Sequence, residues 1–157
     1  MGQVEDRLRA MGLELPPPPV IPHGTRVNLR FAQRAGSFVY LSGMGPLTEG
    51  KVMYSGKVGA DITIEQAYEA ARLTTLNILA VLKGEIGDLD RVTKWVKALG
   101  FVNSAPGFTQ QPAVLNGFSD LIVQLYGEAR GLHARSAVGM ASLPFDIPIE
   151  IEAIVEI

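Results

Sequence analysis

The chain has 157 residues, 47% of them hydrophobic and 19% charged, with a net charge of −2. This is the length of one domain that can bury a hydrophobic core without disulfides or metal ions to stabilise it. Lys and Arg are scattered, so the sequence lacks the basic patch typical of nucleic-acid binders. It contains no cysteine, which excludes disulfides, thiolate nucleophiles and zinc–thiolate sites.

His23 and His133 are the only histidines, too few for a multi-histidine metal site within one chain. No stretch approaches the roughly 18 consecutive apolar residues of a membrane-spanning helix. The N-terminus is charged and resembles no signal peptide. We therefore expect a cytoplasmic protein without a metal ion or a membrane anchor.

The sequence of the N-terminal region predicts a helix followed by an extended connecting segment, which we call the strap. Residues 3–12 place Val4, Leu8 and Met11 on one helical side. Residues 15–22 hold a run of prolines, which lack an N–H and favour an extended connector. We take residues 1–25 as this helix and strap, preceding a single domain over 26–157.

The domain begins with a predicted hairpin and continues with alternating helices and strands. Thr63 and Gln66 have the spacing of a capping box, which predicts the start of a helix ending near 84–87. The other predicted elements are strands over 26–34 and 38–42 around a turn at 35–37, a loop over 43–50, a short strand over 52–54, a strand over 92–102, a loop over 103–111, a helix over 112–128, and strands over 133–141 and 147–157. This order indicates an α+β fold, a mixed sheet with two helices packed on one face.

Arg135 is the most promising residue for chemistry. Alternation along the strand over 133–141 puts Arg135 on one face with Ala137 and Gly139. Small neighbours beside an Arg fork leave room for a small carboxylate. A surface arginine, or one paired with a carboxylate of the next strand, remains the alternative.

The last strand alternates cleanly between a core face and an outer face. The core-facing residues are Ile147, Ile149, Ile151, Ala153, Val155 and Ile157, and the outward-facing ones are Glu150, Glu152, Ile154 and Glu156. Glu150 is nearest the connection to the previous strand, so we expect it to reach a shared site and to orient a water or carry a proton. Ser42, at the end of its strand, could donate a hydrogen bond to a ligand.

A collinear set of motifs resembles the RidA/YjgF family, also called the L-PSP endoribonuclease or translation-inhibitor-like family. The motifs are Val39-Tyr-Leu-Ser-Gly43, Gly87-Asp-Leu-Asp-Arg-Val92, Phe101-Val-Asn103, Asn116, Ala134-Arg-Ser-Ala-Val138, and Leu143-Pro with Ile149-Glu-Ile-Glu-Ala153. The resemblance implies a fold like Bacillus chorismate mutase and a homotrimer with three clefts between subunits. It also implies cofactor-free hydrolysis of enamines and imines, such as 2-aminoacrylate, to 2-keto acids and ammonia.

The same resemblance assigns roles to individual residues. Arg135 matches the arginine that grips the substrate carboxylate, and Glu150 matches the acid that handles the hydrolytic water. The expected substrate-binding residues are Ser42, Gly43, Phe31, Ala137 and Asn116.

Three positions depart from the family pattern. Ala137 stands where a cysteine is frequent, Leu29 where a tyrosine is usual, and Met44 where a glutamine is common. Phe31, on the same strand face as Leu29, could supply the missing ring. These departures leave the arginine in place and change the surroundings of the substrate side chain.

The sequence therefore leaves several functions open. The favoured one is hydrolytic deamination of small imines by a homotrimer. The second is a trimeric module that binds a small carboxylate without turnover, and the third is an endoribonuclease or translation inhibitor. A chorismate mutase-like activity rests on the fold alone.

Overall fold

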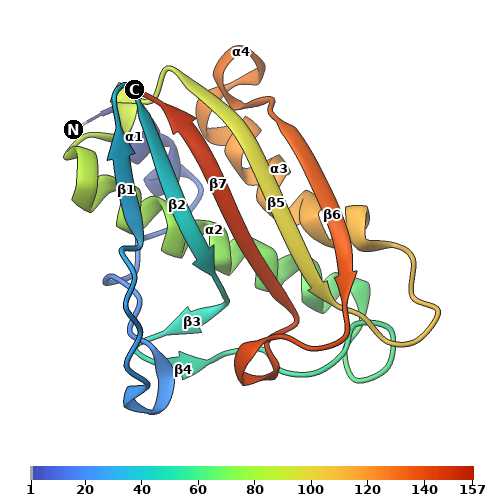
Figure 1. Cartoon of the computed structure of the whole chain (residues 1–157). Helices are drawn as coiled ribbons and strands as arrows, with labels where there is room; N and C mark the ends of the chain where they lie inside the picture. Colours follow the sequence, from blue (N-terminus) through green and yellow to red (C-terminus); the bar gives the residue numbers. More distant parts are fainter. Residues whose placement is uncertain (1) are drawn as a thin grey trace.

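The computed structural model describes residues 2–157, and for His23 only the backbone, so the expectation about His23 lies outside the described residues. A five-stranded sheet is covered on one face by helices, and its other face is open (Figure 1). The strands of this sheet are β1 (Ala32–Ala35), β2 (Phe38–Met44), β5 (Lys94–Asn103), β6 (Ala134–Met140) and β7 (Ile149–Glu156). The helices are α1 (Gln3–Ala10), α2 (Ile64–Ile86), α3 (Gln111–Tyr126) and α4 (Glu128–Gly131), with short 3₁₀ turns η1 (Pro22–Gly24), η2 (Leu89–Arg91) and η3 (Pro144–Asp146). Within residues 2–157, none of the helices combines the length and apolar character needed to cross a membrane.

The strand order is β1-β2-β7-β5-β6, so the last strand lies in the middle of the sheet. Every neighbouring pair is antiparallel except β5 and β6, which are parallel and are connected through α3 and α4. Parallel neighbours need such a crossover, which places α3 against the sheet. The predicted α+β fold, a mixed sheet with two main helices on one face, is confirmed.

The start of α2 follows the predicted capping box. The Gln66 backbone N–H donates to Thr63 Oγ1 at 3.1 Å, and the Thr63 N–H donates to Gln66 Oε1 at 2.9 Å. The helix stops at Gly87, where φ is 81° and the N–H bonds to the Lys83 carbonyl. Glycine adopts this left-handed conformation without strain, as the predicted end of the helix requires.

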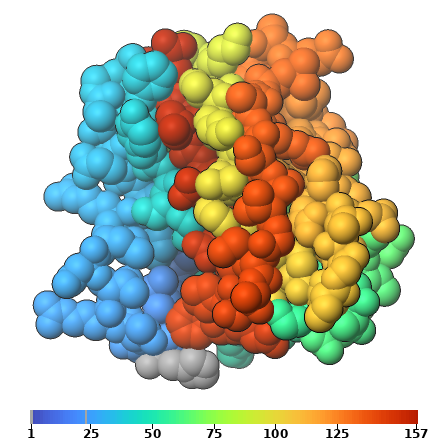
Figure 2. Space-filling model, turned by 45° about the vertical axis from the view of Figure 1, so that its right-hand side comes forward, coloured from blue at the N-terminus to red at the C-terminus, as the bar shows by residue number. Residues whose placement is uncertain are grey.

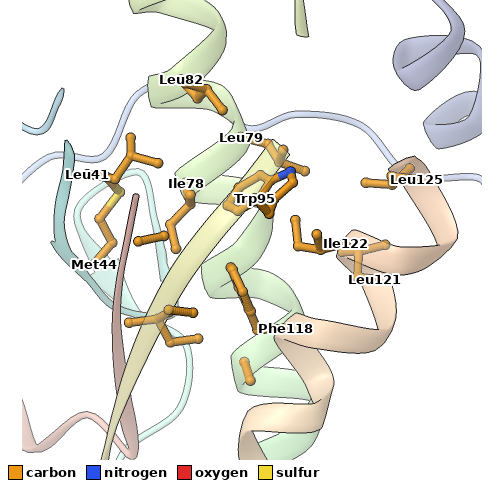
Figure 3. Close-up of a cluster of buried hydrophobic side chains, with 14 of the residues drawn as sticks. Leu41, Met44, Ile78, Leu79, Leu82, Trp95, Phe118, Leu121, Ile122 and Leu125 are labelled. Atoms are coloured by element: carbon orange, nitrogen blue, oxygen red, sulfur yellow. The ribbon is translucent and has the colours of Figure 1, made fainter. Parts of the chain in front are cut away.

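The core lies between the sheet and the helix pair α2 and α3 (Figure 3). Trp95 of β5 is its largest buried side chain, with the Phe118 and Tyr126 rings edge-on at centroid distances of 5.6 and 5.7 Å. Aromatic pairs in this geometry add to the hydrophobic gain from burial. Position 95 thus anchors α3 to β5, the strand next to Arg135.

The first strand is shorter than predicted. Regular pairing begins only at Ala32, and residues 25–31 are irregular. At this point β2 changes register between Leu41 and Met44, and the Ser42 hydroxyl donates to the Arg30 carbonyl at 2.6 Å. The predicted strand over 26–34 is therefore wrong at its N-terminal end, because a side-chain bond and a bulge replace the regular ladder.

The predicted loop over 43–50 is partly wrong as well. β2 continues to Met44, and the chain then forms a small hairpin of β3 (Leu47–Thr48) and β4 (Lys51–Val52). The Asn77 side chain of α2 donates to the carbonyls of Gly45 and Leu47 at 3.0 and 2.9 Å. A buried amide thus ties the hairpin to the helix layer, a contact that local sequence does not reveal.

Gly117 is the point of closest approach between α3 and α2. A methyl group there would clash with the Tyr68 carbonyl oxygen and lie 2.9 Å from the Ala71 Cβ. We expect Gly117→Ala to lower the free energy of unfolding by about 1–3 kcal/mol. Gly84→Ala, in open space on α2, is the matched control, expected to be neutral or stabilising by up to about 1 kcal/mol. Thermal unfolding of both variants measures the effect, and equal melting temperatures would contradict this view of the contact.

Candidate active site

Arg135 lies at the edge of the sheet, on the face that packs against α3. In the parallel register it is paired with Ala98, which is fully buried on the helix-covered face. Its Nη1 donates to Ser119 Oγ at 3.0 Å and its Nη2 to the Pro112 carbonyl at 3.3 Å. Two turns of α3 therefore hold the guanidinium.

Ser119 is itself oriented by His133. The His133 Nδ1 is 2.7 Å from the Gly131 carbonyl oxygen, an acceptor, so this nitrogen carries the proton. Nε2 is then the acceptor for the Ser119 hydroxyl at 2.9 Å, and Ser119 Oγ accepts from Arg135. Burial lowers the pKa of His133, the nearby Arg135 charge lowers it further, and the bond to Gly131 opposes both. The neutral imidazole that this chain of bonds requires is thus favoured.

The Arg135 guanidinium has no carboxylate partner among the described residues, because its hydrogen bonds go to neutral oxygens. Arginine has five N–H donors, so donors remain for a ligand. Ala137 follows on the same strand face, and Asn116 lies on α3 between the two residues that hold the guanidinium. We call Asn116, Arg135 and Ala137 the arginine half-site.

Glu150 lies on the opposite face of the sheet. β7 alternates as predicted, with Ile149 and Ile151 buried and Glu150 half-buried. Glu150, Phe31 and Gly43 line one cavity of about 270 Å³. A methyl group at position 43 would clash with the Glu150 carboxylate, so glycine is what lets β2 approach it. We call Phe31, Gly43 and Glu150 the glutamate half-site.

The carboxyl group of Glu150 is poorly solvated. Burial raises its pKa above the ordinary glutamate value, and the negative charge of Glu152 raises it further. Both effects favour the protonated form. A carboxyl group of this kind stays protonated to a higher pH than an exposed glutamate, and it can deliver a proton or exchange one with a water molecule.

Ser42 lies beside the glutamate half-site but lines a second cavity on the open face, of about 300 Å³. Its hydroxyl proton is directed to the Arg30 carbonyl. In this arrangement the lone pairs of the Ser42 oxygen remain available, and the expectation that Ser42 donates a hydrogen bond to a ligand stays a prediction.

The two halves do not meet within one chain. Arg135 pairs with Ala98 of β5, and Ala98 pairs in turn with buried Ala153 of β7. Glu150 of β7 pairs with Phe101 of β5, and its side chain lies on the other face of the sheet. The expectation that Glu150 reaches a site shared with its preceding strand is thus wrong for a single chain. β6 pairs with β5 instead of β7, and the alternation of the two strands then puts the side chains on opposite faces.

Comparison with known proteins places the chain in a family. Residues 5–151 match the model described as "YjgF/chorismate_mutase-like, putative endoribonuclease". The chain belongs to the YjgF/chorismate mutase-like family. The matched range contains both half-sites, and the resemblance seen in the motifs is confirmed.

Relatives of this family match almost the whole chain. Protein TCP17 of Trypanosoma cruzi is 38% identical over 156 residues, which are 99% of this chain and 95% of that protein. The crystal structure of Atu1372 from Agrobacterium tumefaciens is 42% identical with a TM-score of 0.87, covering 99% of this chain and 92% of that one. The YjgF gene product of Escherichia coli is 25% identical with a TM-score of 0.58, covering 87% and 92%.

Sequence reasoning missed Ser119 and the hydrogen bond that joins it to His133. Both residues contact the Phe118 and Arg135 region, His133 through an edge-on ring contact with Phe118 at 5.3 Å. The available signal was the position of Ser119, seven residues after Pro112 and so on the same side of an α-helix. That side faces β6, but the pairing of α3 with β6 had to be known before the signal could be read.

Proposed function

We propose that this protein is a hydrolytic deaminase of small enamines and imines, assembled as a homotrimer with its active sites between protomers. The observation that carries the proposal is Arg135, held in place by neutral oxygens and without a carboxylate partner in the described chain. Such a guanidinium suits capture of a small carboxylate. Asn116 and Ala137 complete its surroundings.

The separation of the half-sites supports the trimer. Each half carries part of the predicted machinery, and only a second copy of the chain can bring Arg135 beside Glu150. The open face of the sheet also exposes Phe38, Tyr40 and Val138. Apolar side chains gathered on one face favour burial against another protein surface. In a closed ring, each protomer gives one half-site to each neighbour.

The proposed reaction needs little more than positioning. The Arg135 guanidinium holds the substrate carboxylate, so the imine carbon is fixed near Glu150 of the neighbouring protomer. The Glu150 carboxyl group donates a proton to the substrate, either to the carbon of an enamine or to the nitrogen of an imine. The resulting carboxylate accepts a proton as water adds to the C=N carbon. Cleavage of the C–N bond then releases ammonia and leaves a 2-keto acid, with no oxidant or cofactor required.

The test is release of pyruvate and ammonia from 2-aminoacrylate generated in situ. We expect the protein to accelerate both above the buffer rate in equal amounts. Spontaneous hydrolysis is subtracted with heat-denatured protein. An unchanged rate across a panel of imines would overturn the deaminase proposal.

A binding module without turnover is the second candidate. It is favoured by Leu29 and Met44, which depart from the family pattern. Both line the cavity of the glutamate half-site and replace polar groups by apolar ones. Saturable binding of a 2-keto acid with no ammonia release would support this candidate. RNA cleavage, suggested by the family description, would show itself as salt-sensitive RNA binding.

Ser119→Ala tests how the guanidinium is positioned. The variant removes the hydroxyl that accepts from Arg135 Nη1. Loss of a charge-assisted bond of about 1.5–3 kcal/mol lets the fork move, so we expect KM for the imine to rise about tenfold or more while kcat changes less. Ser136→Ala, on the opposite face of β6, is the control. Ser119→Thr retains the hydroxyl and should restore much of the affinity. Equal KM values for Ser119→Ala and Ser136→Ala would refute the positioning role.

A further inference from the structure

The cavity of the glutamate half-site is closed on one side by residues 15–31, which comprise the predicted strap and the irregular residues before β1, and from here on we call this whole stretch the strap. Strap residues supply one wall, and the end of β2 with the segment before β7 supplies the other. Figure 2 shows the blue atoms of the strap at the lower left of the molecule and the orange-red segment before β7 next to them. The apolar lining includes Ile21, Val27, Leu29, Met44, Leu47 and Ile147.

The wall opposite the strap is fixed by hydrogen bonds. Phe145 and Asp146 adopt positive φ angles of 56° and 55°, which non-glycine residues rarely do. Asn103 Nδ2 donates to Asp146 Oδ1 at 3.0 Å, and the Gly56 N–H donates to the Asp146 carbonyl at 2.8 Å. These bonds hold the Phe145 backbone at the cavity wall.

The cavity of the glutamate half-site is lined mainly by apolar residues. Glu150 is the one charged residue among those that line it, and the strap lines it with apolar side chains except for Thr25. A ligand that fits must therefore present its reacting polar group to Glu150 and an apolar group to the strap. The 2-aminoacrylate molecule has no apolar side chain long enough to use this space.

We infer that the strap forms a side-chain pocket that makes the protein selective for 2-imino acids with branched aliphatic side chains. This inference rests on the proposed function. The occupant is the side chain of the substrate, because the cavity is continuous with Glu150 and Gly43. Pockets of this kind discriminate by roughly 10- to 200-fold for each methylene that they bury.

The first test compares two pairs of compounds. The imines are 2-aminoacrylate and the imine of leucine, generated in situ, and the binding probes are pyruvate and 4-methyl-2-oxopentanoate. We expect kcat/KM and affinity to favour the branched member of each pair by at least about 10-fold, the effect of burying one methylene. Equal values, or a preference for the smaller member, would overturn the inference.

The binding arm separates this inference from the proposed activity. Preferential binding of 4-methyl-2-oxopentanoate without turnover of either imine would support the side-chain pocket and refute the deaminase activity. Turnover of 2-aminoacrylate with no preference for the branched compound would do the reverse.

Two valines of the strap provide matched variants. Val27 lines the cavity, whereas Val20 does not and is 60% exposed. We expect Val27→Asn to lower the ratio of the two binding affinities about tenfold and Val20→Asn to leave the ratio unchanged. Both valines are exposed, so neither variant threatens folding. The same ratio in both variants would show that the strap does not contact the ligand.

Discussion

Arg135→Ala is expected to lower kcat/KM for 2-aminoacrylate by about 10- to 100-fold. A charge-assisted hydrogen bond contributes about 1.5–3 kcal/mol, and each 1.4 kcal/mol corresponds to a factor of ten. The loss should appear in KM and in kcat/KM, because the carboxylate is held both before and during the reaction. Arg135→Lys retains the charge but not the fork, so an intermediate value is expected. Initial rates of pyruvate release measure all three proteins.

Arg130→Ala is the matched control for this prediction. Arg130 also donates to backbone carbonyls, those of Asp90 and Val92, and lies over the Tyr126 ring at 5.4 Å. Removing the Arg130 side chain eliminates hydrogen bonds to neutral oxygens, as removing the Arg135 side chain does, but changes no residue of either half-site. We expect a lower melting temperature and an unchanged kcat/KM. If Arg130→Ala and Arg135→Ala lose activity equally, the effect of Arg135 is structural and the carboxylate role is refuted.

Local patterns in the sequence predicted the elements with strong periodicity. The alternation of β7 and the capping box at Thr63 depend on residues close in the chain, and the structure confirms both. The N-terminal half of the first strand was predicted wrongly because its outcome depends on the bond from Ser42 to Arg30. A contact between residues 12 apart competes with the ladder there, and strand propensity cannot report it.

The site was predicted as a set of residues but not as an arrangement. Arg135 and Glu150 follow each other along neighbouring strands in the chain, which invited the idea of one shared face. The sheet instead inserts β5 between β6 and β7, a choice made by the crossover through α3. Strand order depends on packing of whole elements, so the faces on which two side chains lie could not be derived from alternation alone.

The Ser119 and His133 pair shows the same limit at the scale of single bonds. Each residue is unremarkable in sequence, a serine in an amphipathic helix and a histidine before a strand. Their bond forms because α3 crosses β6 where Arg135 emerges. The tautomer of His133 then follows from the Gly131 carbonyl, a backbone group that side-chain patterns do not describe.

Mixing two impaired variants is expected to restore activity, because the proposed site joins half-sites of two protomers. Arg135→Ala retains an intact glutamate half-site, and Glu150→Gln retains an intact arginine half-site. When equal amounts are unfolded together and refolded as trimers, random assembly joins two intact halves at about one quarter of the sites. We therefore expect about one quarter of the wild-type rate of pyruvate release, compared with about one tenth or less for Arg135→Ala alone.

The double variant Arg135→Ala with Glu150→Gln is the control for this experiment. Mixed with Arg135→Ala, it offers no intact arginine half-site, so no activity should return. Mixed with the wild type, it distinguishes the two geometries: shared sites predict about one quarter of the full rate, and sites within one protomer predict about one half. Light scattering establishes that the mixtures are trimers. Trimers formed from Arg135→Ala and Glu150→Gln that stay inactive would mean that Arg135 and Glu150 of different protomers do not meet, and the proposed site between subunits would be refuted.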